Sequence, residues 1–392
     1  MRTQVAIIGA GPAGLTLAHL LHMAGVATVV LEDRSREYVE RRVRAGVLEQ
    51  ATADLLRTMG VSQRMDREGL VHEGIELRFD RRAHRIPMSE LTGGHSVMIY
   101  GQQEMVKDLI RAHLEADGDI RFESECVGID DATTDTPTVR YRADGVERAL
   151  ECDVVAGCDG FHGLSRASIP VHLLKIYDRE LPFAWLGILA ATPPSTTELI
   201  YCSSDRGFAL HSLRSPTISR LYLECRPDED IHEWPDERIW EELRLRFATD
   251  DGWRLRDGPI VEKSVTPMRS FVAEPMRYGQ LFLAGDAAHI VPPTGAKGLN
   301  LAVADARLLA EALKSWYSSG DATLLDTYSS TCLRRVWLAQ QFAVWMTELL
   351  HLPRHDPSGL ERQLQLTRLR YIVSSRAGST MLAENYVGLP SS

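Results

Sequence analysis

A glycine-rich turn near the N-terminus constrains the fold of this chain more than any other feature. Its glycines are Gly9, Gly11 and Gly14, and a short apolar run at residues 4–8 precedes them. Such a run is typical of a buried parallel strand, and the glycines let a phosphate approach the amides of a following helix. Glu32 ends the next apolar run, where a carboxylate can accept hydrogen bonds from ribose hydroxyls. The pattern predicts a strand–turn–helix–strand unit that binds an adenine dinucleotide, but it does not distinguish FAD from NAD.

Periodicity along the rest of the chain predicts further helices and strands. Leucines at helical spacing follow Gly14, and Gly25 is placed to end that helix. Branched residues at 27–31 predict a second strand. We also predict a mostly helical segment at 33–60, a helix at 102–116, short strands within 119–157, strands at 183–189, 198–202, 208–213 and 220–225, a helix at 237–247, and helices from 296 almost to the end.

The length and the order of these elements predict the organisation of the chain. With 392 residues, the chain exceeds what one compact core usually holds, so we expect two coupled domains. The class is α/β (α+β), with a Rossmann-like βαβ domain interleaved with a β-sheet domain and followed by helices. We expect the βαβ domain at 1–175, the β-rich domain at 176–268, a return to the first domain at 269–300 and a helical interface region at 301–392.

The charge balance argues against nucleic-acid binding, and the cysteines argue against an oxidising compartment. The chain has 54 acidic and 44 basic residues, and its net charge of −10 is the opposite of a generic nucleic-acid binder. An anionic substrate would therefore need a local group of arginines. The six cysteines have no Cys-x-x-Cys spacing, and no apolar run approaches the roughly 18 residues of a spanning helix. We therefore expect free thiols, a location in the cytoplasm, no membrane partner and no metal site. At residues 5–8 we expect a strand and not a signal peptide.

Two further turns carry acids at the ends of predicted strands. Gly285 and Asp286 follow an apolar run at 281–283, and an acid there can bind a second ribose-like chain. Asp159 lies in a Gly/Asp turn between a strand and a helix start within 153–166. Each has a simpler interpretation, Asp286 as a helix N-cap and the 153–166 segment as a plain turn. Two separate ribose-binding acids favour a long flavin dinucleotide.

In this order and spacing, the three motifs resemble those of the single-component FAD monooxygenases, the flavin aromatic hydroxylases. The resemblance covers nearly the whole chain and is most specific at 42–50, 285–301 and 384–390. It implies bound FAD. The residues it assigns to FAD are Gly9, Gly11, Ala13, Gly14, Glu32, Arg42, Arg44, Val47, Gln102, Asp159, Arg220, Asp286, Leu299 and Asn300.

The resemblance also implies a site for an aromatic acid. The residues it assigns to this substrate are Tyr201, Ser212, Arg214, Tyr222, Pro293 and Tyr386. The Arg214 guanidinium would bind the carboxylate. It would supply the local positive charge that an anionic substrate needs in a chain with a net charge of −10. Ser212 and Arg214 continue the alternation of Phe208 and Leu210 along one strand face, and polar groups there favour a pocket. Taken alone, the same pattern is equally compatible with a structural ion pair.

The implied activity is hydroxylation of 4-hydroxybenzoate at carbon 3, giving 3,4-dihydroxybenzoate, with NAD(P)H and O₂ and through a flavin hydroperoxide. The implied catalytic residues are Tyr201, Tyr386, His72 and Pro293. Tyr201 would donate to the substrate hydroxyl and favour its phenolate, because hydrogen bonds to an anion lower its pKa. Tyr386 and then His72, titrating near neutrality, would carry the proton to water. Taken alone, His72 is more typical of a surface histidine.

Arg220 and the nicotinamide site are also implied by the resemblance. Arg220 would position a flavin that moves between two places, although a domain-interface salt bridge is an equal alternative. The residues assigned to the nicotinamide are Asp33, Arg34, Tyr38, Arg42, Arg44, His162 and Arg269. A carboxylate at Asp33 should repel a 2′-phosphate, so we expect NADH to be favoured over NADPH. Without the resemblance, Arg42 and Arg44 would indicate only an exposed basic helix face. The family also implies a homodimer, formed through the helical C-terminal third.

Three other functions are compatible with parts of the sequence. A related hydroxylase for another phenolic acid, such as 3-hydroxybenzoate or salicylate, would use the same fold. The set Tyr201, Ser212, Arg214, Tyr222 and Tyr386 argues for the para acid instead. A non-catalytic flavin-binding or ligand-sensing protein would not need a complete polar pocket. A simple NAD dehydrogenase would not need Asp286 or the 153–166 segment.

Overall fold

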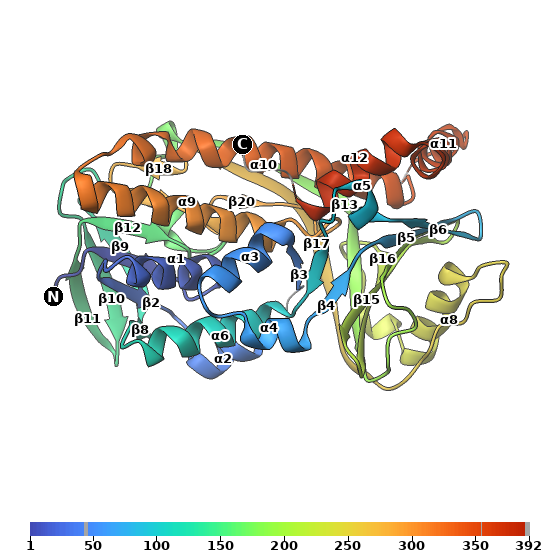
Figure 1. Ribbon diagram of the computed structural model, residues 1–392, viewed down its shortest axis with the longest axis horizontal. Coiled ribbons are helices and arrows are strands. Elements are labelled where there is room, and N and C mark those ends of the chain that lie inside the picture. The colour runs from blue at the N-terminus through green and yellow to red at the C-terminus, as the bar shows by residue number, and fades with distance from the viewer. Residues whose placement is uncertain (43–45, 354, 389–392) are drawn as a thin grey trace.

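The computed structural model, which describes residues 1–42, 46–353 and 355–388, contains two large sheets that lie side by side under a layer of helices (Figure 1). The first sheet has six strands in the order β18-β19-β12-β1-β2-β8. In chain order they are β1 (Val5–Ile8), β2 (Thr28–Leu31), β8 (Asp119–Arg121), β12 (Val154–Gly157), β18 (Arg277–Tyr278) and β19 (Leu281–Leu283). The neighbours β2, β1, β12 and β19 run parallel, so their carboxyl ends meet at one edge.

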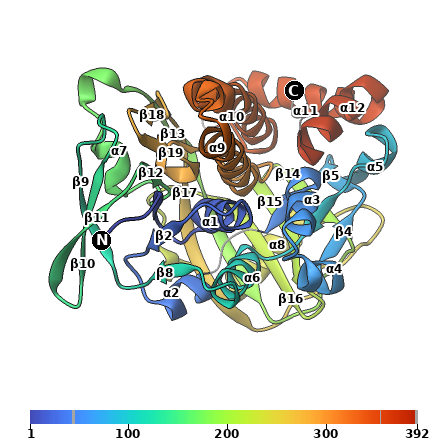
Figure 2. The ribbon, with the colours of Figure 1, turned by 60° about the vertical axis from the view of Figure 1, so that its left-hand side comes forward.

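Long helices cover the first sheet. Helix α1 (Pro12–Met23) packs against both α6 (Gln102–Glu115) and α9 (Gly298–Ser319), and α10 (Thr323–Leu350) packs on α9. Leu17 of α1 and Leu309 of α9 share one hydrophobic cluster with Ile7 of β1. Strands β9 (Glu125–Asp130), β10 (Thr138–Ala143) and β11 (Val146–Glu151) form a separate antiparallel sheet on the side away from α11 and α12 (Figure 2).

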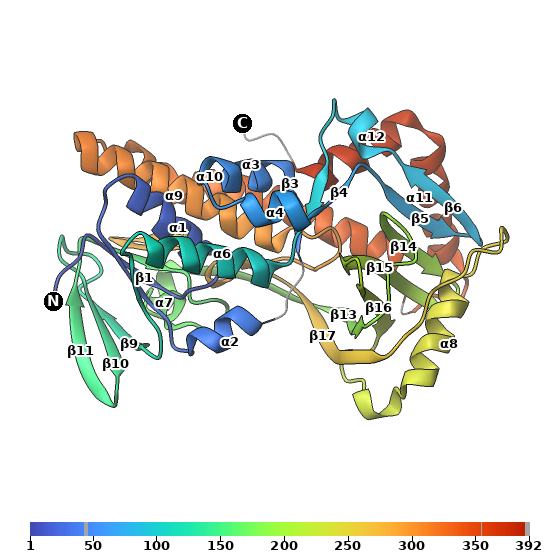
Figure 3. The ribbon, with the colours of Figure 1, turned by 60° about the horizontal axis from the view of Figure 1, so that its bottom comes forward.

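The second sheet has eight strands in the order β20-β17-β13-β16-β15-β14-β5-β6. They are β5 (Ile75–Phe79), β6 (Arg82–Ile86), β13 (Lys175–Ala190), β14 (Leu199–Ser204), β15 (Gly207–Ser215), β16 (Ile218–Cys225), β17 (Ile260–Glu274) and β20 (His289–Ile290). Strands β13 and β17 are the longest, and Figure 3 shows β17 running from the second sheet towards the first. The chain passes from β17 of the second sheet almost directly into β18 of the first.

Each face of the second sheet has its own hydrophobic core. On one face, Ala209 and Leu223 pack with Trp240 of α8 (Asp236–Phe247). On the other face, Phe208 and Leu210 join a cluster that includes residues of α10, α11 (Leu360–Ser374) and α12 (Arg376–Val387). This second face is the one that carries the predicted substrate residues.

The remaining elements are short. A three-stranded sheet has the order β3-β7-β4, with β3 (Val47–Glu49), β4 (Leu70–His72) and β7 (Val97–Ile99). The other helices are α2 (Arg36–Arg41), α3 (Gln50–Thr58), α4 (Gln63–Glu68), α5 (Met88–Leu91) and α7 (Leu164–Ala167), with the one-turn helices η1 (Val171–Leu173), η2 (Ile231–Glu233) and η3 (Gly285–Ala287). Within the described residues, no helix is both long and apolar enough to cross a membrane.

Most sequence predictions of the fold are confirmed. The α/β class, the βαβ unit, the strands of the second sheet and the helical C-terminal part are all present. The helical prediction for 33–60 is wrong at Val47–Glu49, because this short apolar run pairs with β7 as β3. The predicted domain boundaries stay predictions. Strands β5 and β6 precede residue 175 but pair within the second sheet, where β5 lies beside β14.

The glycine turn allows a matched test of folding. A Cβ atom at Gly14 would overlap the carbonyl oxygen of Gly9, whereas a Cβ at Gly11 would meet nothing within 4 Å. Gly11 also has an ordinary φ of −81°. We therefore expect Gly14→Ala to lower the free energy of unfolding of the ligand-free protein by about 1–3 kcal/mol. The control Gly11→Ala should change it by less than about 0.5 kcal/mol. Urea denaturation measures both, and equal losses would contradict this account.

Candidate functional site

The three sequence motifs meet at the carboxyl edge of the first sheet. The Cys158 amide donates to the carbonyl oxygen of Ile8 at 2.8 Å, and the Ala284 amide donates to that of Gly157 at 3.0 Å. The Gly9 amide donates to the Leu31 carbonyl at 2.7 Å. The turns that follow β1, β12 and β19, and Glu32 after β2, are therefore neighbours. This edge is where open α/β sheets bind nucleotides.

The glycine turn has the form of a cradle for a phosphate. Packing explains Gly9 and Gly14, since a Cβ at either would overlap backbone atoms of Cys158 or of Gly9. Packing does not explain Gly11, whose missing side chain would project into open space at the start of α1. A Cβ at Gly285 would lie 3.4 Å from that of Ala13, so the first and second motifs touch. The residues present fit a dinucleotide that spans both turns.

Glu32 is held against the glycine turn by two backbone donors. Its Oε2 accepts from the Ala10 amide at 2.7 Å, and its Oε1 accepts from the Arg34 amide at 3.0 Å. Burial, together with the neighbouring Asp33, raises the pKa of Glu32 to about 7. The carboxylate therefore lies where a ribose would follow the pyrophosphate, and it titrates close to physiological pH.

The other two acids occupy their predicted turns. The Oδ2 atom of Asp159 accepts from the amide and hydroxyl of Ser165, while its Oδ1 is buried with no hydrogen-bond partner among the described residues. Burial also raises the pKa of Asp159. Asp286 is exposed within η3, whose N-cap is Ala284, so the interpretation of Asp286 as an N-cap is wrong. The helix that contains Asp286 is only this one turn, and α9 starts later, at Gly298.

The remaining predicted FAD residues lie on two helix starts and on β3. Gln102 begins α6, while Leu299 and Asn300 lie in the first turn of α9. The Asn300 amide group donates to the Val47 carbonyl at 3.0 Å, and its oxygen accepts from the Glu49 amide at 2.9 Å. Asn300 thereby joins α9 to β3. Arg42 is exposed at the end of α2, and Arg44 lies outside the described residues.

The predicted substrate residues share one face of the second sheet. Leu210 is in register with Tyr201 on one side and with Tyr222 on the other. Ser212 is in register with Arg220, and the predicted alternation of β15 is confirmed because Phe208 and Leu210 face the same core as Tyr201. The Arg214 guanidinium donates to the side-chain oxygen of Gln103 in α6. The polar end of this face therefore reaches the helix that starts at Gln102.

Two tyrosine hydroxyls meet in the core beside this face. The Oη atoms of Tyr201 and Tyr386 are 2.7 Å apart, and both side chains are almost fully buried. Burial raises the pKa of both hydroxyls above their ordinary value, so both keep their protons at neutral pH. Pro293 lies in the same region, where its carbonyl accepts from the Ala296 amide at 3.0 Å. A proton can pass directly between the two tyrosines.

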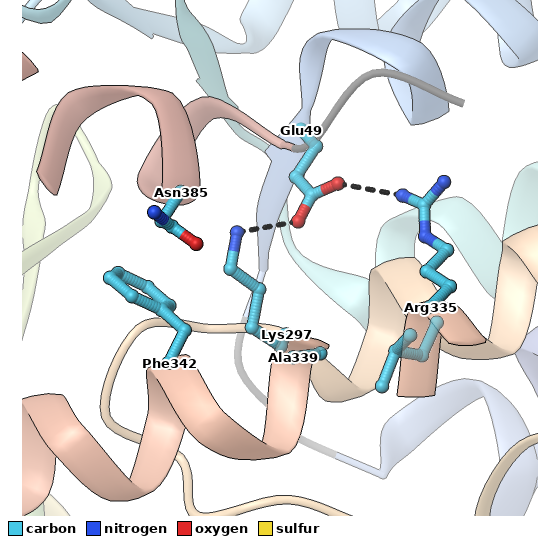
Figure 4. A pocket seen from close by; sticks show the side chains of 7 residues that line it. Glu49, Lys297, Arg335, Ala339, Phe342 and Asn385 are labelled. Carbon is cyan, nitrogen blue, oxygen red and sulfur yellow. Dashed lines mark hydrogen bonds and ion pairs between the residues drawn. The ribbon is translucent and has the colours of Figure 1, made fainter. Parts of the chain in front are cut away.

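A buried charge cluster of Glu49, Lys297 and Arg335 (Figure 4), which sequence reasoning missed, holds the backbone at Tyr386. Lys297 Nζ donates to Glu49 Oε1 at 2.7 Å and to the Tyr386 carbonyl at 3.1 Å. Arg335 completes the cluster through Glu49 Oε2 at 3.0 Å. The available signal was Lys297 itself, the one lysine or arginine of the 285–301 segment, set among glycines and apolar residues.

Two predicted residues have surroundings that differ from expectation. His72 is fully buried in β4, and burial lowers its pKa to about 4. His72 is therefore neutral at pH 7, and both the expected titration near neutrality and the surface interpretation are wrong. Arg220 lies 5.3 Å from the ring centroid of Tyr222, and its Nε and Nη1 are buried without hydrogen-bond partners in the described part of the chain. The alternative of a salt bridge is not found for Arg220 there.

The predicted nicotinamide residues fall into two groups. Before and on α2, Arg34 pairs with Asp33 at 3.2 Å and lies over the ring of Tyr38 at 5.6 Å. Near β13 and β17, Arg269 pairs with Asp178 and lies over the ring of Phe161 at 4.9 Å. His162 is exposed next to that ring. Arg34 and Arg269 therefore each already have a carboxylate partner.

Comparisons with known proteins agree with this geometry. The FAD binding domain family matches residues 2–343. The p-hydroxybenzoate hydroxylase of Acinetobacter baylyi is 49% identical over 390 residues, which cover 100% of this chain and 96% of that protein. An uncharacterized aromatic compound monooxygenase of Bacillus subtilis is 27% identical, over 84% of this chain and 65% of that protein.

Solved structures show the same fold. The p-nitrophenol 4-monooxygenase of Pseudomonas putida superimposes with a TM-score of 0.84 at 20% identity and covers 99% of both chains. A ternary complex of aklavinone-11 hydroxylase with FAD and aklavinone has a TM-score of 0.73 at 25% identity, over 90% of this chain and 70% of that one. With these matches and the meeting of its three motifs, the chain belongs to the FAD binding domain family and, within it, to the FAD-dependent aromatic hydroxylases.

Proposed function

We propose that this protein is an FAD-dependent 4-hydroxybenzoate 3-monooxygenase, which uses a reduced nicotinamide and O₂ to form 3,4-dihydroxybenzoate. The observation that carries the proposal is the buried Tyr201–Tyr386 hydroxyl pair on the sheet face formed by β14 and β15, with Arg214 farther along β15. A para-hydroxy acid carries a hydroxyl at one end of its ring, which suits the tyrosine pair, and a carboxylate at the other end, which suits Arg214. The full-length similarity to p-hydroxybenzoate hydroxylase supports the same substrate.

In this proposal, FAD is held across the three turns at the carboxyl edge of the first sheet. Gly11 and the start of α1 would hold the pyrophosphate, and Glu32 and Asp286 would accept hydrogen bonds from the ribose and ribityl hydroxyls. When bound, FAD supplies the activation of O₂. Arg220, whose guanidinium nitrogens are partly unpaired in the described structure, positions the flavin. The assignments of Arg42, Arg44, Val47 and Gln102 to the cofactor stay predictions.

The protein residues orient and activate the substrate. Arg214 binds the carboxylate, and Ser212 and Tyr222 add further polar contacts. Tyr201 donates to the substrate hydroxyl, which stabilises the phenolate, the form that reacts faster with an electrophilic oxygen. The proton leaves through Tyr386, 2.7 Å away. The role of His72 as the next acceptor stays a prediction, because its lowered pKa makes it a weak base and both of its ring nitrogens lack a hydrogen-bond partner among the described residues. The apolar cluster around Tyr201 excludes water.

We further propose that NADH is preferred to NADPH. Three arginines before and on α2, which could attract a 2′-phosphate, are already paired with carboxylates. Arg34 pairs with Asp33, Arg36 with Glu40 at 2.7 Å, and Arg41 with Glu37 at 2.7 Å. A 2′-phosphate would have to displace these acids and would meet the repulsion of Asp33.

We propose a homodimer formed through the C-terminal helices, in the cytoplasm. Leu360, Leu364 and Tyr371 are exposed at helical spacing on α11, although other residues of this helix are buried in the chain's own core. A helix that is apolar on two faces favours a second contact. The six cysteines are all free thiols, as expected in a reducing compartment.

Anaerobic reduction of the bound flavin tests the function and the nicotinamide together. With 4-hydroxybenzoate present, we expect NADH to reduce the flavin at least about tenfold faster than without it, and faster than NADPH does. In air, the product should be 3,4-dihydroxybenzoate, identified by chromatography. Product from 3-hydroxybenzoate or salicylate, but not from the para acid, would contradict the proposed substrate. A large preference for NADPH would contradict only the nicotinamide assignment.

Replacement of Tyr201 tests the proton pathway. We expect Tyr201→Phe to keep FAD binding but to lower the product formed per nicotinamide consumed by at least about tenfold, because the substrate hydroxyl loses its donor. The exposed Tyr371→Phe is the matched control. Oxygen uptake together with product analysis measures the ratio, and an unchanged ratio would remove Tyr201 from this role.

Replacement of Arg214 tests the carboxylate site. We expect Arg214→Ala to weaken 4-hydroxybenzoate binding by about 2–4 kcal/mol, roughly 30-fold or more, since a buried charge loses its partner. Arg244→Ala, which removes an exposed arginine of α8 paired with Asp257, is the control. Titration of the flavin absorbance gives the dissociation constants. A parental value for Arg214→Ala would place the carboxylate elsewhere.

The raised pKa of Glu32 predicts opposite pH dependences of stability and cofactor binding. Because folding raises this pKa from 4.5 to about 7, Glu32 stabilises the ligand-free fold below pH 4.5, and this contribution is lost as the pH rises through 7. Ribose hydroxyls donate best to the carboxylate, so FAD affinity should instead rise between pH 6 and pH 8. Fluorescence titration with FAD and urea denaturation measure both. Glu32→Gln should remove both dependences, whereas Glu40→Gln should not.

A further inference from the structure

A buried histidine–aspartate pair lies directly behind the Gly285–Ala287 turn. His289 Nε2 is 2.7 Å from Asp305 Oδ2, and the two side chains are only 1% and 2% exposed. Neither residue is among those that the family resemblance assigns to a ligand. His289 belongs to β20, where it pairs with Val272 of β17, and Asp305 lies in α9. The pair therefore joins a strand of the second sheet to a helix of the first domain.

The same carboxylate oxygen fixes the backbone of the turn. Asp305 Oδ2 accepts from the Gly285 amide at 3.0 Å. Gly285 has a φ of +64°, in the left-handed region, and a Cβ there would lie 3.1 Å from that of Ala302. The turn is thus held from behind by Asp305, while the exposed Asp286 side chain projects from it. Any shift of Asp305 would move the peptide that precedes Asp286.

The Asp305 carboxylate favours the protonated form of His289. Burial opposes a charge on His289, but the Asp305 carboxylate outweighs it and raises the pKa of His289 above its ordinary value. Asp286 acts on His289 in the same direction, and Cys332 of α10 is a further neighbour of Asp305. Such a buried ion pair gains little stability over apolar residues of the same volume, because both charges are desolvated. Its presence here points to a role in geometry.

We propose that His289 and Asp305 are positioning residues that hold the Gly285–Ala287 turn in the conformation that binds FAD. Asp305 orients the turn through the Gly285 amide, and His289 keeps the carboxylate in place. The inference rests on the proposed FAD site, since it assigns the pair to the support of Asp286. It adds two residues to that site that do not touch the cofactor.

Substitutions of Asp305 separate the hydrogen bond from the charge. Asp305→Asn keeps an oxygen that can accept from both the Gly285 amide and a neutral His289, whereas Asp305→Ala removes that acceptor. Glu311→Ala is the control, because it removes an exposed carboxylate from the same helix. The measurements are the dissociation constant of FAD from the apoprotein, the apoprotein melting temperature and the visible circular dichroism of the bound flavin.

We expect Asp305→Ala to raise the FAD dissociation constant at least tenfold and to change the flavin dichroism. Asp305→Asn and Glu311→Ala should remain within threefold of the parent. The inference is overturned if Asp305→Ala stays within threefold, or if Asp305→Asn is as impaired as Asp305→Ala, as a purely structural defect would require. If Asp305→Ala is not recovered folded, His289→Leu replaces it and His289→Gln replaces Asp305→Asn. The same limits of tenfold and threefold in the FAD dissociation constant then apply.

The parent protein distinguishes this inference from the proposed function. Failure of the parent to bind FAD would overturn the proposed cofactor site and this inference with it. A parent that binds FAD and hydroxylates 4-hydroxybenzoate, but whose variants do not differ from one another, would overturn only the role of the pair.

Discussion

The parallel pairing of β1, β12 and β19 is the constraint on which the rest of this structure depends. These three strands come from residues 5–8, 154–157 and 281–283, so the register of their hydrogen bonds brings together turns from widely separated parts of the sequence. Because parallel strands all end at the same edge, each following turn lands beside the others. The contact between Gly285 and Ala13 follows from this pairing, and the proposed cofactor site needs it.

Buried charges, not surface charges, shape the region next to this edge. Glu49, Lys297 and Arg335 form one cluster, and His289 with Asp305 forms another. Both clusters include a residue of helix α9 or next to it, Lys297 in the first and Asp305 in the second. Lys297 donates a hydrogen bond to the backbone carbonyl of Tyr386, and Asp305 accepts one from the backbone amide of Gly285. The net charge of −10 therefore says little about local recognition, which depends on a few desolvated groups.

The sequence predicted the local geometry well and the long-range contacts poorly. The spacing of Gly9, Gly11 and Gly14 was sufficient for the βαβ unit, because the strand, turn and helix that these glycines connect follow one another directly in the sequence. The alternation from Phe208 to Arg214 likewise predicted which side chains share a face of β15. In contrast, the burial of His72 and the pairing of Lys297 with Glu49 depend on segments far away in the sequence. No periodicity of the local sequence reports such contacts.

The same reason explains the errors at short elements. Val47–Glu49 is too short to show a period, and it is a strand only because β7 lies beside it. Of the proposed site, the family resemblance supplied Tyr201, Tyr386 and Arg214, but the residues behind them, such as Asp305, came only from the coordinates. Residues that support a site from behind carry no motif of their own, because their role depends on packing.

The continuous strands β13 and β17 have a consequence for how this architecture is inherited. They pair along almost their whole length, from Lys175 with Glu274 near one end to Ala190 with Ile260 at the other. The second sheet also takes in β5 and β6 from before residue 175, and the first sheet takes in β18 and β19 from after β17, so no single cut of the polypeptide separates the two sheets. A segment exchanged with a relative would therefore have to match the register of these strands as well as the residues of the site.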